Sequence, residues 1–182
     1  MKAMIIPGNA DTHITENWFS YIAEKLEKLG LDVIAKDMPD PDLAREEFWL
    51  PFIEQQTKKD EDLILIGHSS GAVAVLRYLE THKCRLAILV GVCHTDLGSE
   101  HEARSGYFSK EWRWNTIKNN ADKIIIFASR DDPYIPIIEP VFIKEKLDAE
   151  YHEYKDEGHF GGDKGKIIFP EIITLIRKFL DK

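Results

Sequence analysis

The sequence predicts a single α/β domain over residues 1–182, a mostly parallel sheet of about six strands with helices on both faces. Its 182 residues match the size of one domain. Short apolar runs alternate with longer segments of helical period, which is typical of a doubly wound sheet with right-handed crossovers. Three of the runs are continuously apolar and rich in Ile, Leu and Val, which indicates strands covered on both faces.

Six segments have the length and side chains of strands. We expect strands at residues 2–6, 32–36, 62–66, 86–92, 123–128 and 150–155. Five further segments repeat apolar residues at helical spacing, and we expect helices at residues 18–29, 43–56, 72–79, 137–147 and 170–180. Gly30 would end the first helix, Asp42 would cap the second, and Pro51 would kink it.

One segment interrupts this alternation. Residues 94–122 follow a predicted strand end, where ligands bind in open α/β sheets, and they form a longer connection than most domains contain. The segment is polar but includes four large aromatic residues: Tyr107, Phe108, Trp112 and Trp114. We therefore expect a short lid-like insertion whose aromatic side chains shape an apolar pocket.

Composition and charge exclude several classes of protein. Hydrophobic residues make up 43% and charged residues 31%, the balance of a globular protein. The formal net charge of −8 argues against binding to nucleic acid or to an anionic membrane, because both attract clustered Lys and Arg. The longest apolar run, residues 86–93, is too short to span a membrane. With no signal-peptide pattern and no disulfide framework from Cys84 and Cys93, we expect a cytoplasmic protein.

A Gly-x-Ser-x-Gly motif directly follows the third predicted strand. The sequence Gly-His-Ser-Ser-Gly occupies residues 67–71, and a helix is expected immediately after it. This order predicts a nucleophile elbow, a sharp turn that exposes the hydroxyl of Ser69 above the sheet. Gly67 and Gly71 are needed because a side chain at either position would collide with neighbouring backbone. The alternative is an ordinary Gly-Ser turn that caps a helix.

A serine nucleophile needs a base, and the base needs a carboxylate to orient it. Asp131 and Asp132 end a predicted strand downstream of Ser69, and His159 follows the last one, so the chain order is the one expected after such an elbow. Asp132 is the preferred acid because Pro133 fixes the turn after it, and Asp131 is then interpreted as a turn-capping residue.

Two backbone N–H groups are candidates for binding an oxyanion. The N–H of Ser70 would lie at a helix N-terminus beside the nucleophile. The second donor should come from the loop after the first strand, where Gly8 permits a close approach, and we expect it to be the N–H of Asn9. The histidines lack the spacing of a zinc helix, so neither a metal nor a cofactor is expected.

Short matches to one known family extend along nearly the whole chain. They include Pro-Gly-Asn at 7–9, Trp-Leu-Pro-Phe at 49–52, Gly-His-Ser-Ser-Gly at 67–71, Asp-Asp-Pro at 131–133 and Gly-His-Phe at 158–160. On these residues the chain resembles the small serine hydrolases typified by retinoblastoma-binding protein 9. The resemblance implies an α/β-hydrolase fold without a large cap domain, and it gives Ser69, Asp132 and His159 the roles of nucleophile, acid and base. It also implies hydrolysis of small esters or aminoacyl compounds.

One departure from that family concerns a partner. Retinoblastoma binding is attributed to a Leu-x-Cys-x-Glu motif, whereas residues 58–62 of this chain read Lys-Lys-Asp-Glu-Asp. We therefore do not expect the retinoblastoma protein as a partner.

The sequence as a whole predicts a serine hydrolase, a carboxylesterase or an aminopeptidase-like enzyme. It would cleave small esters or aminoacyl esters and amides through an acyl-enzyme, with no cofactor. The alternative is a binding or scaffold protein that keeps the fold with little turnover, because fold alone does not establish function. A flavodoxin-like nucleotide or phosphate binder would also fit the alternation, but the chain lacks a Gly-x-Gly-x-x-Gly motif and a P-loop lysine.

Overall fold

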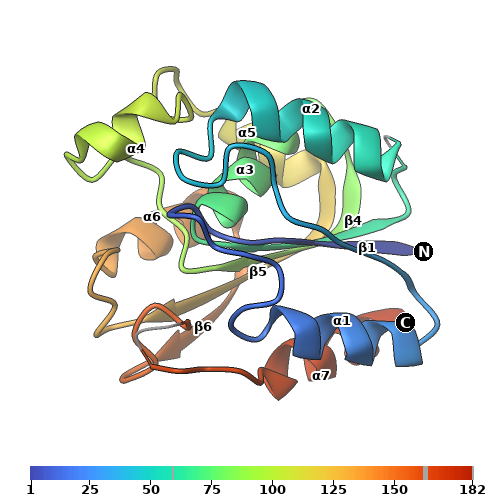
Figure 1. Ribbon diagram of the computed structural model, residues 1–182. Helices are drawn as coiled ribbons and strands as arrows, with labels where there is room; N and C mark the ends of the chain where they lie inside the picture. Colours follow the sequence, from blue (N-terminus) through green and yellow to red (C-terminus); the bar gives the residue numbers. More distant parts are fainter. Residues whose placement is uncertain (59, 162–163, 182) are drawn as a thin grey trace.

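A six-stranded parallel sheet forms the centre of the molecule (Figure 1). The computed structural model describes residues 1–58, 60–161 and 164–181. The strand order is β2-β1-β3-β4-β5-β6, and every neighbouring pair is parallel. The strands are β1 (Lys2–Ile6), β2 (Asp32–Ala35), β3 (Leu63–His68), β4 (Cys84–Val90), β5 (Ala121–Ser129) and β6 (Glu150–Tyr154). The predicted fold class is confirmed.

Helices cover both faces of the sheet. They are α1 (Phe19–Lys28), α2 (Glu46–Thr57), α3 (Ser70–Tyr78), α4 (Glu100–Arg104), α5 (Trp114–Asn119), α6 (Ile138–Leu147) and α7 (Pro170–Leu180). Helices α1 and α7 pack on one face, and α2, α3, α5 and α6 pack on the other (Figure 1). The short helices α4 and α5 both belong to the connection between β4 and β5, which was expected as an insertion.

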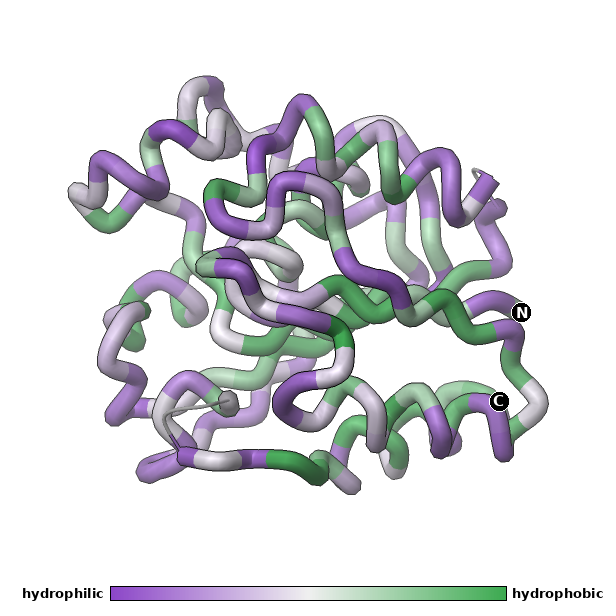
Figure 2. The backbone as a smooth tube through the Cα atoms, viewed as in Figure 1, coloured by the Kyte–Doolittle hydropathy of each residue, from purple (hydrophilic) through white to green (hydrophobic). Residues whose placement is uncertain are grey.

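The strands supply residues to two cores, because successive side chains of a strand point to opposite faces. In β1, Ala3 and Ile5 pack on the side of α1 and α7, whereas Met4 and Ile6 pack on the side of α3. Figure 2 shows the central strands as a hydrophobic band between mostly hydrophilic outer turns. Burial on both faces explains why the central runs of the sequence do not alternate between apolar and polar residues.

The element boundaries differ from the predicted ones for identifiable reasons. Strand β3 continues to His68, because His68 pairs with Val90 of β4. The predicted Asp42 cap of α2 is wrong. Ala44 lies at a φ of 54°, and Arg45 is extended, with its N–H donating to the Asp40 carboxylate at 3.1 Å, so α2 begins only at Glu46.

The parallel arrangement places all six carboxyl ends of the strands at one edge of the sheet. The loops after β1, β3, β5 and β6, which contain the predicted site residues, therefore meet there. Within the described part of the chain, no helix has both the length and the apolar character needed to cross a bilayer. Residue 59 of the 58–62 stretch lies outside the described residues, and so do residues 162–163 and 182 of the predicted 1–182 domain.

Candidate active site

A cavity of about 520 Å³ opens at the carboxyl edge of the sheet. Its lining combines Asn9 from the loop after β1, Ser69 and Ser70 from the turn after β3, and His159 from the loop after β6. Asp132, from the loop after β5, is in contact with the imidazole of His159 and is almost fully buried. The structure therefore brings together all five residues that the sequence predicted for the site.

The turn between β3 and α3 holds Ser69 in an unusual backbone conformation. Ser69 has a φ of 54° and a ψ of −123°, and its N–H donates to the carbonyl of Val90 at 2.9 Å. A Cβ added at Gly67 would lie 2.5 Å from the carbonyl oxygen of Gly71, and one added at Gly71 would lie 2.3 Å from that of Ile6. The predicted collision is confirmed, so the tight passage from strand to helix depends on both glycines.

The side chain of Asp132 orients the imidazole of His159. The His159 Nδ1 atom lies 2.7 Å from Asp132 Oδ2. The other carboxylate oxygen accepts the N–H groups of Tyr134 at 2.9 Å and Ile135 at 3.0 Å. The Asp132 side chain is only 3% exposed, so these bonds fix its direction and hold a proton on His159 Nδ1.

Asp131 lies next to Asp132 but faces away from the imidazole. Its Oδ1 accepts the hydroxyl of Ser129 at 2.7 Å and the N–H of Gly158 at 2.8 Å, and its Oδ2 lies 2.8 Å from the Lys164 ammonium. The bond from Lys164, followed by that from Ser129, lowers the pKa of Asp131 to about 2. Asp131 therefore links the loops after β5 and β6, in keeping with its interpretation as a turn-capping residue.

The two predicted oxyanion donors flank Ser69. Ser70 is the first residue of α3, where an N–H group has no acceptor within the helix. Gly8 lies so close to the elbow that an added Cβ would be 3.1 Å from Ser69 Cβ, which brings the neighbouring Asn9 to the same side of the cavity. Cys93 also lines the cavity, but burial raises the pKa of its thiol well above its ordinary value, so it is a neutral thiol near pH 7.

A family model described as serine hydrolase matches residues 3–178. The chain belongs to the serine hydrolase family. It is 44% identical over 181 residues to Serine hydrolase RBBP9 of Rattus norvegicus, covering 98% of this chain and 95% of that protein. It is also 26% identical over 176 residues to Putative hydrolase YdeN of Bacillus subtilis strain 168, covering 92% of this chain and 90% of the relative.

Solved structures confirm the α/β-hydrolase fold. The crystal structure of the ydeN gene product from Bacillus subtilis superposes with a TM-score of 0.89 at 24% identity, covering 100% of both chains. Est1E from Butyrivibrio proteoclasticus, in a structure with ferulic acid bound, has a TM-score of 0.79 at 14% identity, covering 99% of this chain and 89% of Est1E.

The four aromatic side chains of the segment 94–122 do not line the cavity of this serine hydrolase. The prediction that they shape its apolar pocket is therefore wrong. Tyr107 is buried, and the other three pack against the core around α3. The same segment instead supplies Leu97, His101 and Glu102 to the lining. Large aromatic residues in a long connection fit a core role and a ligand role equally well, and the sequence contains no signal that separates the two.

His68 is a further residue of the hydrolase site that the sequence did not single out. It is buried and packs near Trp18 and Phe19. In addition, its Nε2 donates to the carbonyl of His159 at 2.7 Å. This bond fixes the backbone of the loop after β6 from within the elbow itself.

Proposed function

We propose that this serine hydrolase cleaves small esters or aminoacyl esters and amides through an acyl-enzyme on Ser69. The observation that supports the proposal most strongly is the 2.7 Å separation of His159 Nδ1 and Asp132 Oδ2 beside the cavity that Ser69 lines. An imidazole held in this way is suited to act as a general base toward a serine.

In the first step, Ser69 Oγ attacks the carbonyl carbon of the substrate while His159 Nε2 takes the hydroxyl proton. A C–O bond forms and the carbonyl oxygen becomes an oxyanion. The N–H groups of Ser70 and Asn9 would stabilise that charge, each by roughly 3 kcal/mol. Asp132 stabilises the imidazolium without taking its proton.

In the second step, the imidazolium returns its proton to the departing alcohol or amine as the bond to the carbonyl carbon breaks. Water then attacks the acyl group on Ser69, and His159 Nε2 takes a proton from that water. The tetrahedral intermediate collapses, the carboxylic acid leaves, and Ser69 regains its proton from His159.

The size and charge of the cavity favour small substrates that are neutral or carry an amine. Its volume of about 520 Å³ lies within the usual range for small-molecule sites. Among the described lining residues there is no Lys or Arg, while Glu16 and Glu102 supply carboxylates. An aminoacyl ester fits this charge better than an anionic ester does. A cytoplasmic location completes the proposal, since both cysteines are free and buried.

Labelling with a fluorophosphonate probe tests the proposed nucleophile. We expect intact-mass measurement to show one adduct on the wild type and none on Ser69→Ala. We also expect hydrolysis of p-nitrophenyl acetate by the variant to fall by about 10⁶-fold, as when a triad serine is removed. An unlabelled but folded wild type, or a Ser69→Ala variant that keeps its esterase activity, would contradict the proposal.

A further inference from the structure

The connection between β4 and β5 touches the loop that contains the proposed second oxyanion donor. The side-chain amide of Asn9 donates to Glu102 Oε1 at 2.7 Å, and both residues line the cavity beside Ser69. Glu102 belongs to α4, whose first turn is capped by the Ser99 hydroxyl accepting the Glu102 N–H at 3.4 Å. A carboxylate 93 residues further along the chain therefore binds a residue of the loop after β1.

The loop after β1 needs bonds of this kind to keep its shape. Ala10 and Asp11 have φ values of 54° and 57°, which are unfavourable for residues with a Cβ. Their N–H groups donate to the carbonyls of Asp42 at 3.1 Å and Pro41 at 3.2 Å. Those two bonds hold the residues directly after Asn9. The Thr12 hydroxyl holds the Asn9 carbonyl at 2.7 Å, and Glu102 holds the Asn9 side chain.

The segment that contains Glu102 is hydrogen-bonded to other parts of the molecule on both sides of this residue. At the start, Glu139 of α6 accepts the N–H groups of His94 at 2.8 Å and Thr95 at 3.1 Å. Immediately after α4, the carbonyl of Ser105 accepts the N–H of Glu46 at 2.8 Å. Glu102 is therefore held in place independently of its contact with Asn9.

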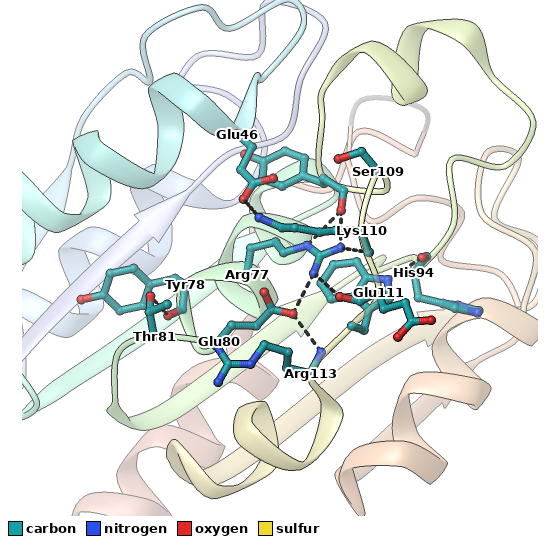
Figure 3. A network of polar contacts seen from close by, with 12 residues as sticks. Glu46, Arg77, Tyr78, Glu80, Thr81, His94, Ser109, Lys110, Glu111 and Arg113 are labelled. Carbon is teal, nitrogen blue, oxygen red and sulfur yellow. Dashed lines mark hydrogen bonds and ion pairs between the residues drawn. The ribbon is translucent and has the colours of Figure 1, made fainter.

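The far end of the connection is fixed by a buried arginine. Arg77 of α3 donates to the carbonyls of Tyr107, Lys110 and Glu111, and it pairs with Glu80 at 2.7 Å. Figure 3 shows Arg77 at the centre of this network. These bonds attach the residues just after α4 to α3, the helix that follows Ser69. They therefore help to hold α4 in place where it lines the cavity.

We propose that Glu102 is a positioning residue of the oxyanion site. Its carboxylate holds the side chain of Asn9, and this keeps the backbone N–H of Asn9 directed at the oxygen that becomes negative in the transition state. A donor fixed in advance needs no reorganisation when the charge develops, which is the source of its catalytic effect. The inference rests on the proposed function and adds to it a residue that acts through Asn9.

Glu102→Ala tests the role with a neutral ester, p-nitrophenyl acetate, so that no substrate charge is involved. Complete loss of an oxyanion donor costs about 10²- to 10³-fold, and a misdirected donor should cost about 10- to 100-fold in kcat with little change in KM. Glu102→Gln keeps an acceptor oxygen for Asn9 and should stay within about threefold of the wild type. Glu100→Ala removes an exposed carboxylate from the same helix and serves as the matched control.

A double-mutant cycle with Asn9→Ala isolates the contact, because this variant keeps the backbone N–H while losing the bond to Glu102. We expect the double variant to be no slower than either single variant within about twofold, as for two groups that act through one bond. Unchanged kcat in Glu102→Ala, equal loss in Glu102→Gln, or additive losses would each overturn the inference. A loss confined to amine-bearing esters would also overturn it, since Glu102 would then act on substrate charge.

The same measurements separate this inference from the proposed function. Hydrolysis that requires Ser69 but is indifferent to Glu102 contradicts only the positioning role. Hydrolysis that persists in Ser69→Ala contradicts the proposed function.

Discussion

Asp131 and Asp132 are adjacent in the chain, yet their carboxylates bind different groups. Asp132 contacts His159 Nδ1 at 2.7 Å, whereas Asp131 accepts the hydroxyl of Ser129 and the N–H of Gly158. Both side chains belong to the turn after β5. The backbone directs the Asp132 carboxylate toward the imidazole and the Asp131 carboxylate toward the backbone of the loop that contains His159. The assignment of the acid therefore depends on direction and not on residue type.

Replacing each aspartate by asparagine should separate the two. Asp132→Asn places an amide against His159 and favours the wrong tautomer, so turnover of an ester should fall by about 10⁴-fold. Asp131→Asn keeps an oxygen for Ser129 and Gly158, and turnover should change by less than about tenfold. Steady-state kinetics on both variants checks this. If Asp131→Asn shows the larger loss, the acid has been misassigned.

At this scale the sequence was most informative where a side chain directly follows a strand. Ser69, Asp132 and His159 each come within a few residues of a strand end, so strand prediction alone placed them at one edge of the sheet. Glu102 and His68 could not be found in this way. Their contacts with Asn9 and with the carbonyl of His159 join residues 93 and 91 positions apart, and no local pattern encodes such a pairing.

The element with the most demanding geometry is the elbow between β3 and α3. Ser69 has a φ of 54°, in the left-handed region that favours glycine, while Gly67 and Gly71 pack directly against backbone atoms. The elbow therefore maintains a strained serine through the close packing of a strand, a helix and the end of β1. Strain of this kind is expected where a side chain must stand clear of the sheet.

The strain can be measured by comparing Ser69→Gly with Ser69→Ala. Both variants should be inactive, but glycine adopts the left-handed conformation freely. After allowing for its greater freedom in the unfolded chain, we expect Ser69→Gly to be more stable by about 1 kcal/mol. Urea unfolding of the two variants provides the test, and equal free energies of unfolding would show that the turn stores no strain.

Prediction of the elements succeeded for strands that are buried on both faces, and it failed for the shortest helices. The apolar runs of β3, β4 and β5 are unbroken because helices cover both faces. Helices α4 and α5 have five and six residues, too few for a helical repeat to be recognised. The start of α2 was misplaced because the Asp40–Arg45 contact extends the backbone before the helix, and no capping motif indicates that contact.

At the scale of the whole molecule, the connection between β4 and β5 is part of the core and not a separate layer. The Arg77 guanidinium stacks over Trp112, with 3.6 Å between its Cζ and the ring centroid, and its side chain is fully buried. Burial lowers the pKa of Arg77, and Glu80 opposes that shift. Arginine still remains charged because its ordinary pKa is so high. Figure 3 shows the Arg77 guanidinium donating to several carbonyls of this connection.

Removing that cation should loosen the whole connection. Arg77→Met removes the cation that pairs with the buried Glu80, which keeps the N–H of Arg113, and it takes the side-chain donor from the carbonyls of Tyr107 and Lys110. Breaking a buried ion pair from one side costs about 3–5 kcal/mol. Arg77→Lys should lose less, because an ammonium keeps the charge but cannot reach all of the same acceptors.

Urea unfolding measures the loss of stability, and limited proteolysis should cut Arg77→Met between α4 and α5 before any other site. Arg85→Met is the matched control, since Arg85 is half-exposed on β4 and forms surface ion pairs, which contribute little to stability. If Arg77→Met unfolds at the same urea concentration as Arg85→Met and resists the protease equally, the connection is held by its apolar contacts alone. Glu102 would then owe its fixed position to Glu139 and to the backbone bond between Ser105 and Glu46.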